Sequence, residues 1–271
     1  MPGLTYRDLT TLEEFADVVE LERQIWGPGY DEVVPVPILA VSVHRGGILI
    51  GGFDGDRMVA FVYSLPGIKD GRATQWSHMA GVVAGYRGAG LGRTLKLLQR
   101  ERALAMGLDL IEWTYDPLQA MNAHLNFAKL GVVAREYAEN IYGTSSSPLH
   151  QGNPTDRFIA EWLIREPRVE ERLRGAVPLA TVLVVEPANR TRPAGEFLEP
   201  AAVDLSLDVR RISVEIPAGF TEMLSSAPEL ALEWRMATRS LFTSYFGRGY
   251  RAVEFFLDRE ARKGAYLLVR N

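Results

Sequence analysis

The feature that most constrains the fold is a glycine-rich turn between a strand-like segment and a helix-like segment. Residues 74–84 form an apolar, strand-like run, and residues 91–106 carry apolar side chains at helical spacing. Four glycines lie between positions 85 and 92. Glycine reaches backbone conformations that other residues avoid, and a helix N-terminus presents unpaired N–H groups to an anion. The sequence therefore predicts a strand, an anion-binding turn and a helix in direct succession.

The remaining pattern places this turn within a sheet protein. The expected elements are helices near 12–26 and 38–44, a hairpin of strands 47–53 and 58–65, a strand at 108–115, a helix at 118–130 that Asp116 caps, and strands at 132–137 and 158–164. Late alternation of strands and helices predicts partly parallel pairing with helices on the sheet faces. The predicted fold class is α/β (α+β), with a mixed central sheet flanked by helices.

The C-terminal part reads as a second, smaller α+β domain. We expect domains at 1–165 and 166–271, the latter including the linker. The expected elements are a linker at 165–180, a surface loop at 187–200, a strand at 209–216, a helix at 228–246 and a hairpin of 252–256 with 265–269. In the long helix, Leu230, Trp234, Ala237 and Leu241 recur at spacings of three or four. This stripe predicts core packing or, alternatively, the interface of a homodimer.

Composition excludes several classes of function. The 271 residues include no cysteine and carry a formal charge of −4, which argues against disulfides, a Cys nucleophile and a broad nucleic-acid surface. The four histidines lack zinc-site spacing, so no metal is expected. No apolar run approaches the roughly 20 residues of a membrane helix. With no basic and apolar leader pattern, we expect no membrane partner and a cytoplasmic location.

The glycine spacing discriminates between nucleotide-binding motifs. A phosphate-binding loop of the Gly-x-x-x-x-Gly-Lys-Ser/Thr type is absent, and Arg93 occupies the position of the third glycine in a dinucleotide fingerprint. The spacing present is Arg87-x-x-Gly90-x-Gly92. Arg87 and Arg93 add positive charge to the turn, so a pyrophosphate is the expected ligand.

This spacing resembles the coenzyme A pyrophosphate motif of the GNAT superfamily of N-acetyltransferases. Val82 matches the position whose backbone pairs with pantetheine in that family. A second segment, Ala123-x-x-x-Phe127-x-Lys129-x-Gly131, resembles the family's later helix. It departs in two places, because Ala120 and Phe127 replace the usual Asn and Tyr. In many relatives that Tyr is proposed to protonate the departing thiolate.

The resemblance covers roughly residues 5–165 and implies a GNAT fold and an acyl-CoA-dependent N-acyltransferase. The acyl group of acetyl-CoA or succinyl-CoA would be transferred directly to the amine of a small molecule. Trp76-Ser77-His78-Met79 and Trp113-Thr114-Tyr115-Asp116-Pro117-Leu118 resemble a bacterial and archaeal subgroup. Some members of that subgroup are proposed to succinylate amino acids, so the resemblance implies an amino acid as one candidate acceptor. The residues expected to bind coenzyme A are Val82, Val83, Arg87, Gly88, Ala89, Gly90, Leu91, Gly92, Arg93, Asn126 and Lys129.

Catalytic candidates follow from what amine acylation requires. A base must deprotonate the amine, and His78 or Glu112 are the candidates. Each has a structural alternative: a hydrogen-bonded histidine, and a buried partner of Arg157 or another arginine. Tyr142 could replace the missing phenol, or be structural. The backbone of residues 81–83 is expected to donate to the oxyanion.

Two other functional interpretations of the sequence remain open. One is a GNAT-derived module that binds coenzyme A with little or no catalysis, which Phe127 and the unassigned base favour. The other is a dinucleotide-binding oxidoreductase, which the glycine spacing argues against.

Overall fold

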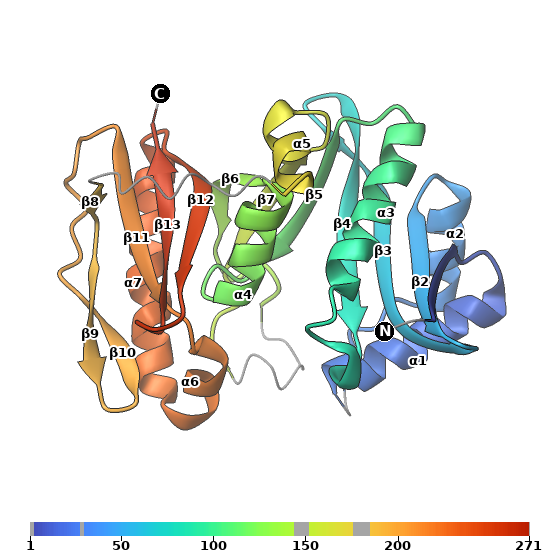
Figure 1. The fold of residues 1–271 in the computed structure, drawn as a ribbon, viewed down its shortest axis with the longest axis horizontal. Helices are drawn as coiled ribbons and strands as arrows, with labels where there is room; N and C mark the ends of the chain where they lie inside the picture. The colour runs from blue at the N-terminus through green and yellow to red at the C-terminus, as the bar shows by residue number, and fades with distance from the viewer. Residues whose placement is uncertain (1–2, 28–29, 144–151, 176–184, 271) are drawn as a thin grey trace. The chain divides into compact units, whose positions relative to one another are not determined.

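The computed structural model describes residues 3–27, 30–143, 152–175 and 185–270, which form two compact units. The first unit ends at Trp113, and the second comprises the described residues from Thr114 onwards. The division lies within strand β5 (Leu110–Tyr115), shown among the labelled elements of Figure 1. The domain boundary expected at 165/166 stays a prediction. Each unit has its own core, and we describe them separately.

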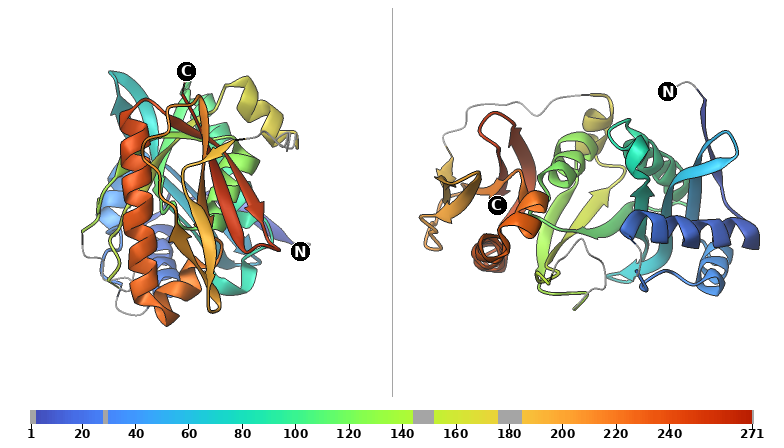
Figure 2. Two further views of the ribbon diagram at one scale, coloured as in Figure 1. Left: turned by 90° about the vertical axis from the view of Figure 1, so that its left-hand side faces the viewer. Right: turned by 90° about the horizontal axis from the view of Figure 1, so that it is seen from below.

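The first unit is a sheet with helices on both faces. Its elements are β1 (Leu4–Asp8), α1 (Leu12–Trp26), α2 (Val36–His44), β2 (Ile48–Asp54), β3 (Arg57–Lys69), β4 (Arg72–Val82), the short η1 turn (Ala84–Tyr86), α3 (Leu91–Ala105) and the start of β5. The strands are adjacent in chain order, antiparallel up to β4, and β5 then pairs with β4 in parallel. Helices α1 and α2 cover one face and α3 covers the other (Figure 2).

Helix α1 shows how local sequence positions an element against the sheet. The Thr11 side chain accepts a hydrogen bond from the Glu14 N–H, and the Glu14 carboxylate accepts one from the Thr11 N–H. This capping box fixes the start of the helix. Near the other end, Ile25 and Trp26 lie directly over β4. A Cβ added at Gly81 would lie 2.7 Å from Ile25 Cδ1. Gly81 thus permits close approach of α1 rather than forming a bulge.

The second unit is built around further strands and one long helix. Its elements are α4 (Ala120–Ala123), the π-helical turn η2 (His124–Leu130), β6 (Val133–Ala138), β7 (Arg157–Leu163), α5 (Pro167–Leu173), β8 (Glu186–Pro187), β9 (Arg190–Ala194), β10 (Phe197–Ala201), β11 (Arg211–Pro217), α6 (Phe220–Ser226), α7 (Pro228–Gly247), β12 (Arg251–Asp258) and β13 (Lys263–Val269). The strand order is β7-β6-β12-β13-β11-β8, with β9 and β10 as a separate hairpin.

Aromatic side chains fill the core of the second unit. Phe158 lies 4.5 Å from Phe242 and 5.3 Å from Tyr266 between ring centroids, in edge-on geometries that aromatic pairs favour. On α7, Trp234 and Leu241 are fully buried. The stripe on this helix therefore packs within its own unit, and a homodimer stays a prediction.

The predicted fold class is confirmed, because mixed sheets are flanked by helices, and most predicted elements lie within a few residues of their expected bounds. The helix expected at 118–130 begins at Ala120 and becomes π-helical at His124. Asp116 does not cap it. Its carboxylate instead accepts the Leu118 N–H and pairs with Arg235.

Two irregular segments were predicted wrongly. Residues 165–180 include helix α5, because Pro167 occupies its first turn, where proline is favoured; residues 176–180 lie outside the described residues. Residues 187–200 form strands rather than a loop. Their prolines are tolerated since β9 and β10 make a two-stranded hairpin with open edges.

Gly264 on β13 should be intolerant of substitution. A Cβ there would lie 2.1 Å from Cζ of the buried Phe255 ring. We expect Gly264→Ala to destabilise the protein by about 1–3 kcal/mol through overpacking, measured by urea or thermal unfolding. The matched control is Gly247→Ala at the end of α7, where a Cβ meets no atom within 4 Å. Equal stability of the two variants would contradict the packing role.

Candidate functional site

Strand β4 contains a β-bulge, and its pairing with β5 ends just before that bulge. Its ladder with β3 skips His78, which is the extra residue of a β-bulge. Its ladder with β5 consists of Gln75↔Ile111 and Trp76↔Glu112, which both precede the bulge, and the residues that the structure describes form no further pair. Beyond the bulge, one edge of β4 therefore presents its backbone without a strand partner.

The direction of the backbone determines which groups face this edge. The Val83 N–H donates to the Val59 carbonyl of β3 at 3.0 Å. Because successive residues of a strand point their N–H groups to opposite sides, those of Val82 and Ala80 face the open edge. In agreement, Nε of Arg87 donates to the Val82 carbonyl at 3.2 Å. The Val83 N–H, which was expected to bind the ligand, is thus already bonded within the sheet. The N–H groups of Val82 and Ala80 can still pair with an extended ligand.

The glycine-rich segment forms the turn that the sequence predicts. Gly88 and Gly90 adopt φ angles of +79° and +84°, the left-handed region that favours glycine. Gly90 is the N-cap of α3, and no side chain caps that end. Within the described chain, no acceptor binds the backbone N–H groups of residues 88–92. These donors, together with the partial positive charge of the helix end, form a site for an anion.

Side chains around the turn add to this property. Arg87 is exposed and Arg93 is half-buried in the first turn of α3, so both bring a positive charge to the same helix end. Leu91 is buried and anchors the helix start in the core. A Cβ added at Gly92 would meet nothing within 4 Å, so internal packing does not require glycine there. The structure thus brings the predicted residues 87–93 together in one turn.

His78 is placed where a base could act. Its imidazole reaches the surface, and its ring stands edge-on to Tyr63, with centroids 6.1 Å apart. Partial desolvation by the surrounding protein lowers the pKa of His78. The ring is therefore neutral at pH 7, the form that accepts a proton.

Glu112 has a structural partner. Its carboxylate is buried, and Oε1 lies 2.5 Å from the Lys69 Nζ. The expectation of an arginine partner is wrong, since Lys69 fills that role. A buried carboxylate held by an ion pair is costly to break and already satisfied, which favours the structural alternative for Glu112.

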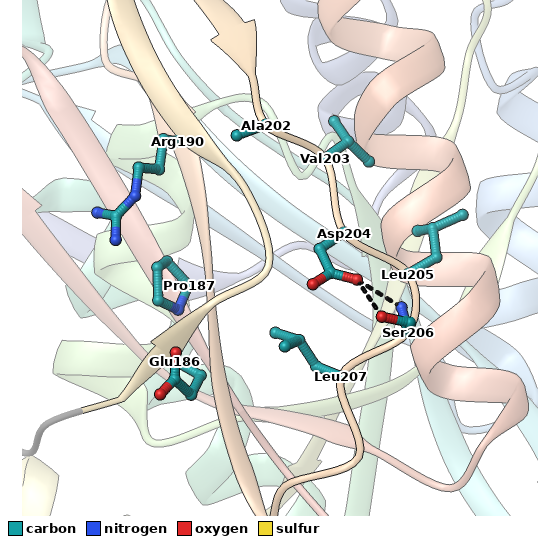
Figure 3. A pocket seen from close by; sticks show the side chains of 9 residues that line it. All are labelled: Glu186, Pro187, Arg190, Ala202, Val203, Asp204, Leu205, Ser206 and Leu207. Carbon is teal, nitrogen blue, oxygen red and sulfur yellow. Dashed lines mark hydrogen bonds between the residues drawn. The ribbon is translucent and has the colours of Figure 1, made fainter.

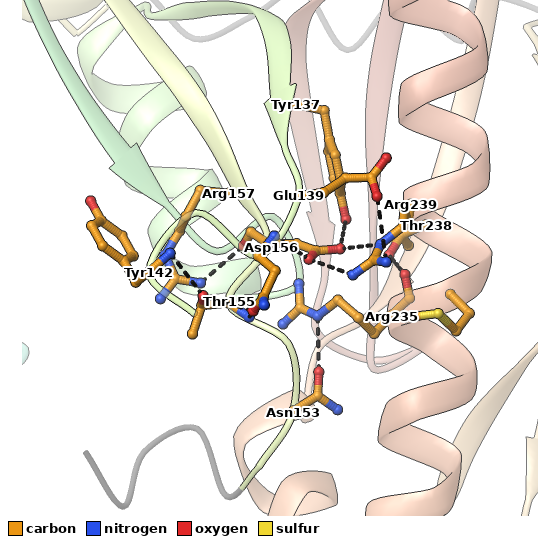
Figure 4. Close-up of polar contacts among 12 residues, drawn as sticks. Tyr137, Glu139, Tyr142, Asn153, Thr155, Asp156, Arg157, Arg235, Thr238 and Arg239 are labelled. Carbon is orange, nitrogen blue, oxygen red and sulfur yellow. Dashed lines mark hydrogen bonds and ion pairs between the residues drawn. The ribbon is translucent and has the colours of Figure 1, made fainter. Parts of the chain in front are cut away.

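Tyr142 belongs to the second unit and lies at one end of a polar network (Figure 4). Its hydroxyl shares a hydrogen bond with Thr114 Oγ1 at 2.7 Å, and its ring lies 5.6 Å from the Arg157 guanidinium. The side chain is 43% exposed. Tyr142 is therefore a surface tyrosine rather than a buried one, and its catalytic role stays a prediction.

The rest of this network consists of buried ion pairs. Arg235 binds both carboxylate oxygens of Asp116, at 2.9 and 2.7 Å. Burial alone would raise the pKa of Asp116, but the Arg235 charge outweighs burial and lowers it. Asp156 accepts two bonds from Arg239 and one from the Tyr137 hydroxyl. These groups are mutually satisfied, and they tie α7 to the strands of its unit.

The remaining predicted contacts also lie in the second unit. Asn126 is buried within the π-helical turn, and Lys129 is exposed. Phe127 is fully buried, with Tyr266 edge-on at 5.6 Å. Asn126 and Lys129 stay predictions as coenzyme A contacts. Phe127 brings no proton donor to any site.

Two buried ionisable residues of the first unit were missed by the sequence analysis. Lys96 lies on the buried face of α3, and burial lowers its pKa to about 7. Glu22 lies on α1, and burial raises its pKa to about 7. A lysine beside Leu95 on the apolar face of the helix was the available signal for the first. No sequence signal marked Glu22, since it is one of several acidic residues on its helix.

Glu22 is part of a polar cluster that lacks partners. Its Oε2 accepts the Val34 N–H at 2.9 Å. Its Oε1 has no hydrogen-bond partner in the described chain, and the Ser42 and Tyr63 hydroxyls lie close to each other with no other partner there. The Glu22 charge contributes to a raised pKa of Tyr63, after burial, so these groups lie near one another. A protonated Glu22 or a buried water would satisfy them.

Other features of the surface carry less chemistry. An open depression of about 880 Å³ on the second unit is lined by β8, Arg190 and residues 202–207. Figure 3 shows the side chains that line it. Its Asp204 carboxylate is bonded to Ser206 of its own turn. In the described ranges, no three His, Cys, Asp or Glu side chains are grouped to hold a metal ion. None of the helices in those ranges is long and apolar enough to cross a membrane.

Comparison with known proteins gives structural matches only. No family model and no curated protein matches the sequence. Similar solved structures include the ribosomal-protein-S18-alanine N-acetyltransferase from Escherichia coli, at 17% identity over 59% of this chain and 94% of that chain, with a TM-score of 0.48. A GNAT-family acetyltransferase from Streptococcus pneumoniae matches at 16% identity over 58% of this chain and 98% of that chain, also at 0.48.

A third match is a Salmonella typhimurium protein described as an acetyltransferase and solved with its cofactor acetyl-CoA. It has 17% identity over 60% of this chain and 95% of that chain, with a TM-score of 0.48. All three are named as acetyltransferases, and the Streptococcus pneumoniae protein is named as one of the GNAT family. At identities below 25% and TM-scores below 0.5, the ligands of these proteins cannot be assigned to this chain.

The raised pKa of Glu22 predicts how stability depends on pH. The unfolded carboxyl titrates near 4.5 and the folded one near 7, so between these values the folded state holds a proton that the unfolded state has lost. Stability therefore falls as pH rises through this window. We expect Glu22→Gln to remove the fall and to be more stable than wild type at pH 8, by roughly 1–3 kcal/mol, but not at pH 4.5.

Urea unfolding at the two pH values measures this effect. Glu20→Gln is the matched control, since Glu20 lies on the same helix with its side chain 79% exposed. Identical pH slopes for wild type and Glu22→Gln would show that Glu22 does not titrate as described.

Proposed function

We propose that this chain is an acyl-CoA-dependent N-acyltransferase of the GNAT type. One observation carries the proposal: the anion-binding turn of residues 87–92 continues directly from a strand whose edge beyond His78 is unpaired. Coenzyme A consists of a pyrophosphate followed by a pantetheine arm with two amide groups. The turn offers N–H donors and arginines to the first, and the strand edge offers backbone groups to the second.

The same geometry supports direct transfer to an amine. His78 is neutral at pH 7 and able to accept the proton that the amine must lose. An N–H of the open β4 edge, from Val82 or Ala80, is a donor for the oxyanion of the tetrahedral intermediate. The N–H groups of Gly81 and Val83 face β3 instead, so Val82 is the one residue of the expected range 81–83 whose N–H faces the open edge, and Ala80 is added to it.

The finer features of the proposal come from the sequence resemblance. The resemblance to a subgroup with proposed amino-acid succinyltransferases supports succinyl-CoA beside acetyl-CoA as donor, and a small amine such as an amino acid as acceptor. A GNAT domain at 1–165, a homodimer and a cytoplasmic location belong to the same proposal. No nucleic-acid or membrane partner is included, given the charge of −4 and the absence of a long apolar run in the sequence.

A second candidate function is a coenzyme A-binding module with little catalysis. Two observations favour it. Phe127 is fully buried where relatives carry the proton-donating Tyr, and Glu112 is engaged by Lys69. Both candidates bind coenzyme A, so only turnover separates them.

The test of turnover is a matrix of acyl-CoA donors and amines, with free thiol followed by absorbance and products by mass spectrometry. We expect thiol release that depends on an added amine, with acetyl-CoA or succinyl-CoA as donor. Binding of coenzyme A without thiol release for any pair would support the binding module instead.

The binding site itself is tested by Arg87→Ala. Removing one charge-assisted hydrogen bond costs about 1.5 kcal/mol, so coenzyme A should bind roughly tenfold more weakly by isothermal titration calorimetry. Arg23→Ala is the control, because Arg23 is 51% exposed on α1, outside the turn. Equal affinities of the two variants would remove the turn from the proposed site.

A further inference from the structure

A buried polar cluster lies on the α3 side of β4, where the ladder with β5 ends. The Lys96 Nζ donates to Ser77 Oγ at 2.7 Å and to Gln99 Oε1 at 3.3 Å. The Gln99 Nε2 donates to the same Ser77 Oγ at 3.0 Å. The ammonium also lies 3.8 Å from the centre of the Trp113 ring. All four side chains are at most 6% exposed.

An apolar residue at position 96 would fill this space without the cost of burying a charge. The partners of Lys96 are a hydroxyl, an amide and an aromatic ring, all of them neutral. Elements packed against α3 carry other titratable groups, namely Asp54 on β2, Arg57, Tyr63 and Lys69 on β3, Arg72 and His78 on β4 and Glu112 on β5. None of these adds to the effect of burial, which lowers the pKa of Lys96 to about 7. Such a group is half-protonated at neutral pH and able to give and regain a proton.

The hydrogen bonds fix the direction of the Ser77 hydroxyl. A serine hydroxyl has two acceptor lone pairs and one donor hydrogen. Both lone pairs of Ser77 are occupied, by the Lys96 ammonium and the Gln99 amide, and an ammonium can only donate. The hydroxyl hydrogen therefore points away from both partners. Among the described residues it has no acceptor.

We propose that Ser77, with Lys96 behind it, donates the proton that the departing coenzyme A thiolate requires, in place of the phenol that Phe127 lacks. This inference rests on the proposed acyltransferase function. It names a catalytic group, Ser77, and the residue that recharges it, Lys96.

The position of Ser77 suits this task. It immediately precedes the bulge at His78, at the far end of the open edge from the pyrophosphate turn. From Val82 to Ser77 the strand extends about 17 Å at about 3.3 Å per residue, comparable to an extended pantetheine arm. Ser77 contacts α3 on one face of the sheet, whereas the His78 ring contacts Tyr63, on the face that α1 and α2 cover. Base and acid thus flank the same point of β4.

The amine nitrogen attacks the thioester carbon, and its proton passes to His78. As the tetrahedral intermediate collapses, the carbon–sulfur bond breaks and the sulfur takes the proton of the Ser77 hydroxyl. The Lys96 ammonium returns a proton to Ser77, and water carries the proton of His78 back to Lys96. The products are the amide and free coenzyme A, with no net change in the protein.

The test compares Ser77→Ala and Lys96→Met with wild type. A thiolate must leave whichever nucleophile attacks, so both amine-dependent transfer and hydrolysis of acetyl-CoA are followed by thiol release. We expect kcat to fall about 10²-fold in each variant, at the lower end of the range for general-acid catalysis, with the Kd for coenzyme A within twofold of wild type. The wild-type kcat should decline as pH rises through about 7, where Lys96 loses its proton, and Lys96→Met should lack this limb.

Controls separate chemistry from structure. Ser64→Ala removes another buried serine hydroxyl of the same unit, one that donates to Gln75 at 2.7 Å, and it should leave kcat within twofold. Unfolding curves should show Lys96→Met no less stable than wild type, since replacing a buried charge by an apolar side chain relieves desolvation.

The outcomes are distinguishable. Thiol release that Ser77→Ala leaves unchanged would overturn this inference alone. A loss of coenzyme A binding in Ser77→Ala that matches the loss of kcat would also overturn it, since Ser77 would then hold structure. A wild-type protein that binds coenzyme A and releases no thiol, with or without amines, would overturn both this inference and the proposed function.

Discussion

The bulge at His78 is the constraint on which the proposed site depends. Strand β4 must stay paired with β3 along its whole length and yet leave β5 after Trp76↔Glu112. One extra residue achieves this, because a bulge bends and twists the strand that carries it. The open edge, the surface position of His78 and the inward position of Ser77 all follow from that single irregularity. The turn at residues 87–92 then only has to lie where β4 ends.

Some buried charged groups of the chain are paired with an opposite charge and others are not. This difference distinguishes structural ion pairs from groups that can take part in a reaction. Glu112 is neutralised by Lys69, and Asp116 by Arg235, in pairs that need nothing further. Lys96 has neutral hydrogen-bond partners and a pKa moved towards 7. A paired ion stabilises by staying ionised, whereas an unpaired buried ion is held near its titration point by desolvation. Groups of the second kind are those that a reaction uses, because their protonation changes at little cost.

Local signals in the sequence were sufficient to predict most elements and the glycine-rich turn. Thr11 and Glu14 defined the start of α1, and the spacing of Arg87, Gly90 and Gly92 identified the turn, because caps and glycine turns are determined by near neighbours. The features that the sequence did not predict depend on residues that are distant in the chain. The fate of Asp116 is decided by Arg235 on α7, more than a hundred residues later, and the bulge is a property of register between two strands. No periodicity reveals either.

Phe127 stands where many of the N-acetyltransferases that the sequence resembles carry a tyrosine, and its surroundings are consistent with a proton donor on β4. Phe127 is sealed among aromatic side chains, with Tyr115 at 6.4 Å and Tyr266 at 5.6 Å between ring centroids. A phenol there would need a buried hydrogen-bond partner, at a desolvation cost of a few kcal/mol if it found none. Placing the proton donor on β4 avoids that cost and keeps the base, the acid and the pyrophosphate turn within one compact unit. In the proposed enzyme, a single strand and the turn that follows it control both the binding of the acyl donor and the protons that move during transfer.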